Sequence, residues 1–282
     1  MANIIDGKKI SLEIKDEVKA RVEAVKAKGI EPCLAVILVG DNPASQVYVR
    51  NKKKACEYCG IKSLSYELPE STTEEELLDL VNQLNMDKSC NGILVQLPLP
   101  KHIDEEKILL AIKPEKDVDG FHPYNVGLLS IGKADLKACT PAGCIELIKR
   151  SGVDIAGKSC VVVGRSNIVG KPVGMLLLTE NGTVTTCHSK TKNMAELCSQ
   201  ADILVVAIGK EKFIKADMVK EGAVVIDVGI NRMENGKLCG DVDYEQVEKK
   251  AGYITPVPGG VGPMTIAMLM NNCLIACEKQ NS

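Results

Sequence analysis

The chain has 282 residues, of which 45% are hydrophobic and 26% charged, and its formal net charge at pH 7 is −2. It is long enough for one or two domains with a sizeable core, and its composition is typical of a globular protein in water. The balanced charge, with no tryptophan and two phenylalanines, argues against a nucleic-acid partner, which would need a basic surface or aromatic platforms.

Short aliphatic segments alternate with longer amphipathic ones along the chain. The expected strands are 33–39, 62–68, 92–98, 159–164, 183–188, 202–208 and 223–229. The expected helices lie near 7–28, 44–59, 73–86, 104–111, 141–150, 170–179 and 263–279. Most of the strands are nearly continuous in Val, Ile and Leu, which is typical of a parallel sheet covered on both faces. The alternation predicts an α/β fold with right-handed crossovers.

Three local patterns add to this outline. Thr73 and its neighbouring hydroxyl residues precede the acids 74–76, which suits the start of a helix. The stretch 113–143 is polar and rich in Gly and Pro, and we expect it to connect two domains. The stretch 255–265 has three prolines and three glycines before a final apolar helix.

Twelve cysteines are present, most of them inside apolar runs, as Cys33 and Cys160 are. There they are expected as small core hydrophobes. Cys56 and Cys59 form a C-x-x-C pair, but no second pair at metal-binding spacing accompanies it, so we expect no metal site. The first residues lack a signal-peptide pattern, and no apolar run reaches spanning length. The sequence thus predicts a cytoplasmic protein without a membrane partner.

A candidate nucleotide site follows the expected strand 159–164. Gly164 permits a tight turn there, and the helix that begins near residue 170 offers N–H groups that suit a pyrophosphate. The spacing is not G-x-G-x-x-G, so this segment alone also fits a plain strand-to-helix turn. The two later strands, 202–208 and 223–229, are each followed closely by or end in glycine, which favours a nucleotide site at this edge.

The next strand suggests which nucleotide is bound. An NAD site usually has an acid at the end of that strand, whereas here the chain has His188, Ser189, Lys190 and Lys192. Arg165 lies in the glycine loop itself. Cations and a hydroxyl favour a 2′-phosphate and hence NADP, although a solvated loop of lysines is the alternative.

Four residues of the first half are candidates for the chemistry. Tyr48 and Lys52 are four residues apart on an expected helix, although the run of three lysines also fits a solvated helix face. Gln96 is a polar residue at the end of an apolar strand, where a buried amide needs a partner or a ligand. Asp119 lies in the polar connection. The alternatives are core filling for Tyr48, a strand cap for Gln96 and a turn residue for Asp119.

These segments together give the chain a resemblance to a known family. It resembles the bifunctional methylenetetrahydrofolate dehydrogenase/methenyltetrahydrofolate cyclohydrolase family along essentially its whole length. The resemblance runs through VGDNPASQVYVRNKKKAC, GILVQLPLP, PEKDVDGFHPYNVG, CTPAGCIELI, VVVGRSNIVGKPVGMLL and TPVPGGVGPMT. It implies that 5,10-methylenetetrahydrofolate is oxidised with NADP⁺ and the product hydrolysed to 10-formyltetrahydrofolate, in one-carbon metabolism and purine biosynthesis.

The resemblance also implies roles for individual residues. Lys52 matches the catalytic lysine, Gln96 the glutamine that contacts and tunes it, Tyr48 the tyrosine over the pterin, and Asp119 the acid that pairs with the pterin. The expected substrate contacts are Tyr48, Val95, Gln96, Leu97, Pro98, Asp119, Pro258, Gly259 and Gly262. The expected cofactor contacts are Gly164, Arg165, Ser166, Ser189 and Ile230.

The same resemblance implies two lobes and a homodimer formed through the dinucleotide lobe. Residues 1–139 and 263–282 would form the folate-binding lobe, and 140–262 a Rossmann-type NADP lobe. Three other readings stay open: a monofunctional dehydrogenase, which would be expected to lose the lysine, a dinucleotide-sensing protein without turnover, and a dehydrogenase of another small acid.

Overall fold

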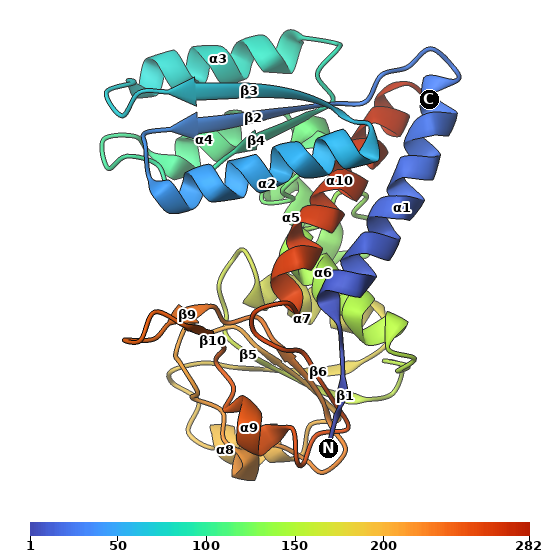
Figure 1. The fold of residues 1–282 in the computed structure, drawn as a ribbon, viewed down its shortest axis with the longest axis vertical. Coiled ribbons are helices and arrows are strands. Elements are labelled where there is room, and N and C mark those ends of the chain that lie inside the picture. The colour runs from blue at the N-terminus through green and yellow to red at the C-terminus, as the bar shows by residue number, and fades with distance from the viewer. The chain divides into compact units, whose positions relative to one another are not determined.

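The computed structural model describes the backbone of all 282 residues and every side chain except that of Ala44. The chain divides into two compact units, which are described here separately (Figure 1). The three-stranded unit comprises Leu12–Cys139 and Ile266–Ser282, and the six-stranded unit comprises Met1–Ser11 and Thr140–Thr265. The first eleven residues thus differ from the expected division, because β1 (Asn3–Ile4) pairs with β11 (Tyr253–Ile254) in the larger sheet.

The three-stranded unit is a parallel sheet in the order β3-β2-β4. Its strands are β2 (Cys33–Val39), β3 (Lys62–Leu68) and β4 (Gly92–Val95), and its helices are α2 (Pro43–Cys59), α3 (Glu74–Met86), α4 (Glu105–Ala111), α5 (Pro123–Ser130) and most of α1 (Gly7–Lys26) and α10 (Val261–Gln280). Helices α2 and α3 cover opposite faces (Figure 1). Every residue of β2 is buried, because apolar side chains on both faces meet a helix layer.

Helix α3 begins where the sequence predicts a helix start. The Thr73 hydroxyl accepts a hydrogen bond from the Glu76 N–H at 3.2 Å, and the Thr73 N–H donates to Glu76 Oε2 at 2.8 Å. This reciprocal pair is a capping box, which satisfies N–H groups that the helix cannot pair internally.

The six-stranded unit is a parallel sheet in the order β1-β11-β8-β7-β5-β6. Its longer strands are β5 (Ser159–Val163), β6 (Thr183–Cys187), β7 (Ile203–Val206) and β8 (Val224–Asp227). Its helices are α6 (Cys139–Arg150), α7 (Gly170–Thr179), α8 (Met194–Ser199) and α9 (Tyr244–Val247). Strands β7 and β8 are buried along their whole length. The parallel sheets bear out the predicted α/β class.

Several short elements were not predicted. They are β1, β11, the hairpin of β9 (Asn231–Arg232) with β10 (Leu238–Cys239), α5, α8, α9, and the 3₁₀ helices Pro114–Lys116 and Ala216–Met218. Elements this short carry too little periodicity to be recognised. The expected strand 92–98 is shorter than predicted, because β4 ends at Val95.

Helix α10 corrects the expectation that no apolar run reaches spanning length. By length and composition it could cross a membrane, with a mean hydropathy of 1.2 over its most apolar window. However, 61% of that window is buried inside the protein, and Cys273, Leu274 and Cys277 are fully enclosed. The helix packs here as a core helix.

Candidate functional site

Lys52 lies on the inward face of α2. Val49, Cys56 and Cys59 are buried three residues before it and four and seven residues after it, as expected for one face of a helix. Lys52 itself is only 9% exposed, whereas Lys53 and the next lysine are exposed. One lysine of the run of three is therefore buried, which is not expected of a plain solvated helix face.

Gln96 is the hydrogen-bond partner of this lysine. Lys52 Nζ donates to Gln96 Oε1 at 2.9 Å. The amide is held by its own chain, because the Gln96 N–H donates to the Ile37 carbonyl at 2.8 Å and its Nε2 donates to the Leu97 carbonyl at 2.7 Å. The amide oxygen is thus left to face the lysine. An amide accepts a hydrogen bond without adding a negative charge that would hold the lysine protonated.

Asp119 interacts electrostatically with Lys52. Burial lowers the pKa of Lys52, and the carboxylate of Asp119 opposes this shift. Burial raises the pKa of Asp119 to about 6, opposed by Lys52. Asp119 is half-buried, and its carboxylate accepts no hydrogen bond from any side chain or backbone group that the structure describes. It is therefore free to accept two parallel hydrogen bonds from a ligand.

A second acid, missed from the sequence, holds the segment that carries Asp119. Asp117 is 3% exposed. Its carboxylate accepts from the backbone N–H groups of Gly120, Phe121 and His122 and from Asn125 Nδ2. The only sequence signal was its place two residues before Asp119 in KDVDG. A carboxylate with four donors fixes a turn strongly.

Asn272 of α10 fixes the same segment from another side. Its Nδ2 donates to the carbonyls of Val118 at 2.8 Å and Lys137 at 2.7 Å, and the Cys139 thiol also donates to the Val118 carbonyl. Asn272 is 2% exposed. The residue directly before Asp119 is thereby tied to the last helix, so the position of Asp119 depends on three separate stretches of chain.

The other predicted substrate residues of this unit lie around the same strand end. Tyr48 stands one turn before Lys52 on α2 and is 49% exposed. Val95 is the buried last residue of β4, Leu97 is half-buried and Pro98 is exposed. An aromatic side chain left half in solvent beside a buried lysine is available to a flat ligand.

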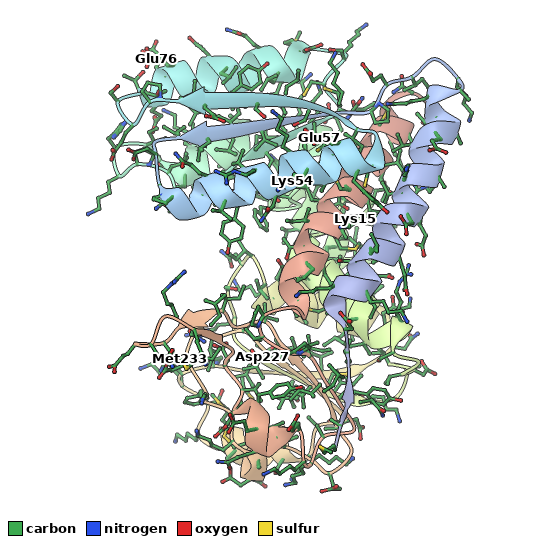
Figure 2. The ribbon with its side chains drawn as sticks, in the orientation of Figure 1. Lys15, Lys54, Glu57, Glu76, Asp227 and Met233 are labelled. Carbon is green, nitrogen blue, oxygen red and sulfur yellow. The ribbon has the colours of Figure 1, made fainter. Side chains whose placement is uncertain are left out.

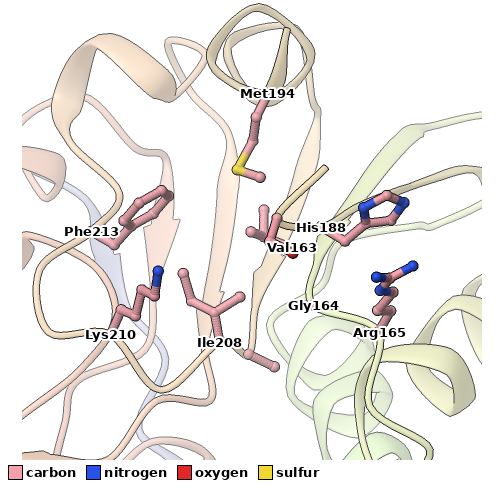
Figure 3. A pocket seen from close by; sticks show the side chains of 10 residues that line it. Val163, Gly164, Arg165, His188, Met194, Ile208, Lys210 and Phe213 are labelled. Carbon is pink, nitrogen blue, oxygen red and sulfur yellow. The ribbon is translucent and has the colours of Figure 1, made fainter. Parts of the chain in front are cut away.

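The predicted cofactor residues lie mostly around a cavity of about 290 Å³ in the six-stranded unit (Figure 3). The cavity opens at the carboxyl ends of β5, β6 and β7, the usual ligand edge of such a sheet. It is lined by Val163, Gly164, Arg165, His188, Ser189, Met194, Ala207, Ile208, Lys210 and Phe213. One side is apolar, and Arg165 and His188 stand together on another (Figure 3). That arrangement suits an adenine and a phosphate.

The backbone of this cavity explains the glycine. Gly164 has φ +129°, and a Cβ there would lie 2.3 Å from the Ala207 carbonyl oxygen, so no other residue fits. Ser166 does not line the cavity; its hydroxyl accepts from the Val169 and Gly170 N–H groups. His188 Nδ1 accepts from the Lys190 N–H at 3.1 Å, which leaves Nε2 as the ring donor.

The remaining predicted residues line a second cavity of about 190 Å³ in the same unit. Ile230, Pro258, Gly259 and Gly262 all contribute to it. Sequence reasoning placed Ile230 with the cofactor and the other three with the substrate, and the structure brings the four together. Asp227, which the sequence did not single out, also lines this cavity.

The twelve cysteines are free and buried throughout the described chain. Burial raises the pKa of Cys56 to about 12 and that of Cys59 to about 11, so both are neutral thiols at pH 7. Both side chains are fully enclosed on the inner face of α2. Among the described residues no group of three or more His, Cys, Asp or Glu is arranged to hold a metal ion. The C-x-x-C pair is core filling.

Comparisons with known proteins agree with this geometry. Residues 5–119 match a family model described as the tetrahydrofolate dehydrogenase/cyclohydrolase catalytic domain, and residues 138–281 match its NAD(P)-binding domain. A curated relative from Agathobacter rectalis, named bifunctional protein FolD, is 67% identical over 99% of this chain and 100% of its own.

Two solved structures are similar over nearly the whole chain. The bifunctional FolD enzyme of Campylobacter jejuni has a TM-score of 0.96 and 55% identity, covering 99% of each chain. The Trypanosoma brucei dehydrogenase-cyclohydrolase, solved with NADP cofactor and an inhibitor, has a TM-score of 0.92 and 42% identity, covering 99% of this chain and 98% of that one.

Proposed function

Because the chain belongs to the tetrahydrofolate dehydrogenase/cyclohydrolase family, we propose that the site around Lys52 serves both of its reactions. The resemblance seen in the sequence, the two activities and the NADP cofactor are confirmed. The chain oxidises 5,10-methylenetetrahydrofolate with NADP⁺ and hydrolyses the methenyl product to 10-formyltetrahydrofolate. The readings as a monofunctional dehydrogenase, a sensor without turnover or a dehydrogenase of another acid find no support. The part-buried Lys52–Gln96 hydrogen bond carries the residue assignment.

The oxidation depends on positioning. A hydride leaves the one-carbon bridge of the substrate, driven by the lone pairs of its two nitrogens, and NADP⁺ supplies the acceptor. The product is a methenyl cation shared between those nitrogens. Asp119 would hold the pterin through two hydrogen bonds, and Tyr48 would pack against its face. Proton transfer is not needed in this step, so orientation supplies most of the rate.

The hydrolysis needs a proton acceptor and then a proton donor. Water adds to the methenyl carbon while neutral Lys52 takes its proton, and the tetrahedral adduct forms. The adduct then collapses: its hydroxyl loses a proton to solvent as the C=O forms, the bond from that carbon to N5 breaks, Lys52 returns its proton to N5, and the formyl group stays on N10. The lowered pKa of Lys52 brings its neutral form closer to the working pH, which is what general acid–base catalysis requires.

The cofactor residues of the six-stranded unit fit NADP. Arg165, His188 and Ser189 gather hydrogen-bond donors at one part of the cavity, which suits the 2′-phosphate. Ser166 holds the start of α7, because its hydroxyl accepts from the Gly170 N–H and its carbonyl accepts from the Lys171 N–H. These N–H groups are already paired, so the donors that line the cavity support the cofactor assignment.

A single progress curve tests the assignment to both reactions. Purified protein is mixed with methylenetetrahydrofolate and NADP⁺, and NADPH and the methenyl chromophore are followed together. We expect NADPH to rise with little accumulation of methenyl compound beyond its spontaneous hydrolysis. Methenyl compound that accumulates one for one with NADPH would leave only the dehydrogenase and remove the hydrolytic role of Lys52.

We also propose that the chain acts as a cytoplasmic homodimer and supplies formyl groups to purine biosynthesis. The outer edge of β6 has no partner strand among the described residues, and Leu178 of the adjacent α7 is 64% exposed; together they support a dimer contact on this unit. Twelve free thiols support a reducing compartment. The balanced charge supports a small-molecule substrate as the partner, without nucleic acid or membrane. Sedimentation equilibrium and cell fractionation test the dimer and the location.

A further inference from the structure

Asp241 is a fully enclosed carboxylate that the reactions described above do not use. It is 0% exposed. Its Oδ2 accepts from the N–H groups of Ile208 at 2.7 Å and Gly209 at 3.0 Å, and its Oδ1 accepts from the Lys210 N–H at 2.8 Å and Asn231 Nδ2 at 2.9 Å. Three consecutive backbone N–H groups directed at one carboxylate form a strongly held turn.

A second buried carboxylate holds the first in place. Asp227, labelled in Figure 2, is the last residue of β8 and is 3% exposed. It accepts from the Gly229 N–H at 3.0 Å, from the Asp241 N–H at 3.0 Å and from the Val242 N–H at 2.9 Å. The segment with Asp241 is thereby joined to the end of β8.

Two glycines in the local sequence make room for these carboxylates. A Cβ at Gly229 would lie 2.3 Å from Asp241 Oδ1, and a Cβ at Gly240 would lie 1.8 Å from Asp227 Oδ2. Two glycines therefore let the two acids approach backbone that any larger residue would block. Such a tight arrangement holds the segments around it in one particular geometry.

The segments that the two acids hold are the walls of both cavities. Ile208 and Lys210 line the 290 Å³ cavity. Gly229 and Ile230, next to Asn231, line the 190 Å³ cavity. Both cavities lie at the carboxyl edge of the six-stranded sheet, where a dinucleotide binds. One hydrogen-bonded chain through Asp227 and Asp241 thus spans the expected cofactor site.

We propose that Asp241, supported by Asp227, is a positioning residue for NADP⁺, which sets the turn 208–210 and the segment at Ile230 in the geometry that binds the dinucleotide. This role rests on the proposed use of the six-stranded unit as the cofactor site. The hydrolysis consumes no NADP⁺, so the protein carries an internal control for it.

Asp241→Asn tests the proposal. Each carboxylate oxygen of Asp241 accepts two hydrogen bonds from N–H donors. In either orientation the new amide NH₂ replaces one of these oxygens and faces donors instead of accepting from them, so the turn 208–210 must shift. We expect the KM for NADP⁺ to rise by about 10- to 100-fold, the effect of leaving such donors unpaired, with kcat changed less. Hydrolysis of the methenyl compound, measured in the same preparation without NADP⁺, should stay within about twofold of wild type.

Asp243→Asn is the matched control. It makes the same substitution two residues along, where the side chain contacts Lys215 at 3.0 Å. An ion pair with one exposed partner contributes little, so both activities should stay at the wild-type level. Should Asp241→Asn fail to fold, Asn231→Ala removes a single donor to Asp241, and a roughly threefold rise in the KM for NADP⁺ with unchanged hydrolysis is expected.

Two results would overturn the proposal. One is a parallel loss of both activities, which would make Asp241 a stability residue. The other is an unchanged KM for NADP⁺ in a folded variant. Titration of wild-type protein with NADP⁺ by calorimetry separates these results from a failure of the proposed function, since that failure would appear as no NADP⁺ binding to the wild type.

Discussion

Asp117 and Asp241 make the same kind of contact in the two units, but the segments that they hold have different functions. Each is buried and accepts four hydrogen bonds, from three backbone N–H groups and one asparagine amide. Asp117 holds a segment that presents one unpartnered carboxylate, Asp119. Asp241 holds a turn that presents backbone and cavity walls. In both units an aspartate that accepts four hydrogen bonds fixes a backbone segment. Only in the three-stranded unit does that segment also carry an aspartate without a hydrogen-bond donor, Asp119.

The difference distinguishes a reacting site in the three-stranded unit from a cofactor-binding site in the six-stranded unit. Lys52 and Asp119 carry opposite pKa shifts with the same cause, burial, and each opposes the shift of the other. Groups with perturbed titration and few partners are typical of reacting sites. In the six-stranded unit, the cations that line the cavity instead serve to attract phosphate. The first unit should therefore respond to substitution in its chemistry, and the second in cofactor affinity.

The largest expected effect is that of Lys52→Met, which keeps an unbranched side chain in the buried position and removes the amine. Hydrolysis of the methenyl compound should fall by about 100-fold or more, the usual contribution of a general acid–base group, while the dehydrogenase reaction falls less. The decay of methenyl absorbance measures it. Lys53→Met, at the exposed neighbour, is the control and should leave both rates unchanged. Wild-type hydrolysis in Lys52→Met would remove this lysine from the mechanism.

Arg165→Ala should lower cofactor affinity, the response expected of the six-stranded unit. Removing a phosphate partner should weaken NADP⁺ by about 10- to 100-fold, as expected for a charge-assisted hydrogen bond, and weaken NAD⁺ much less. Dehydrogenase KM values for the two cofactors measure the difference, and hydrolysis should be unaffected. If both cofactors weaken equally, Arg165 contacts the pyrophosphate or supports the fold.

Asp117→Asn breaks the comparison most directly, because it is the same exchange as Asp241→Asn in the other unit. The misplaced amide should displace Asp119 and raise the KM for the folate substrate about 10-fold, in the dehydrogenase and the hydrolysis alike. The KM for NADP⁺ should stay near its wild-type value. An effect on the dehydrogenase alone would show that the two acids do not serve separate sites.

The sequence predicted the long elements well and the saturated acids poorly. The ranges of β2 and β3 match the expected strands, because seven residues of strong β character suffice to define a strand. Gln96 was singled out because an amide that ends an apolar strand breaks a local rule. Lys52 was assigned through the resemblance, since its run of three lysines also fits a solvated helix face. Their hydrogen bond joins residues 44 positions apart, which only the resemblance anticipated.

Asp117 and Asp241 break no local rule. Each lies before or near glycine, in KDVDG and GDVD, where an aspartate is usually a turn residue. Their donors are backbone N–H groups, which every residue except proline carries, and for Asp241 they lie 31 to 33 positions away. No side-chain pattern reports such contacts. The same reason hid the pairing of β1 with β11, which joins residues 250 positions apart.

The smallest expected effect concerns how two buried acids coexist. Burial and the neighbouring Asp241 raise the pKa of Asp227 to about 7, against the pull of three backbone N–H donors. The folded chain therefore binds this proton more tightly than the unfolded chain does. The stabilisation from Asp227 is full below its unfolded pKa, near 4, and is lost as the pH rises to about 7.

Asp227→Asn stays neutral at every pH, so it should not share this loss. Between pH 5.5 and 7.5 the wild-type free energy of unfolding should fall by about 2 kcal/mol relative to the variant, measured by urea denaturation. Asp119 titrates in both proteins and cancels. A constant difference would mean that Asp227 is ionised throughout, and that its three N–H donors outweigh the effect of burial on its carboxylate. The second unit would then rely on hydrogen bonds alone, as Asp117 does in the first.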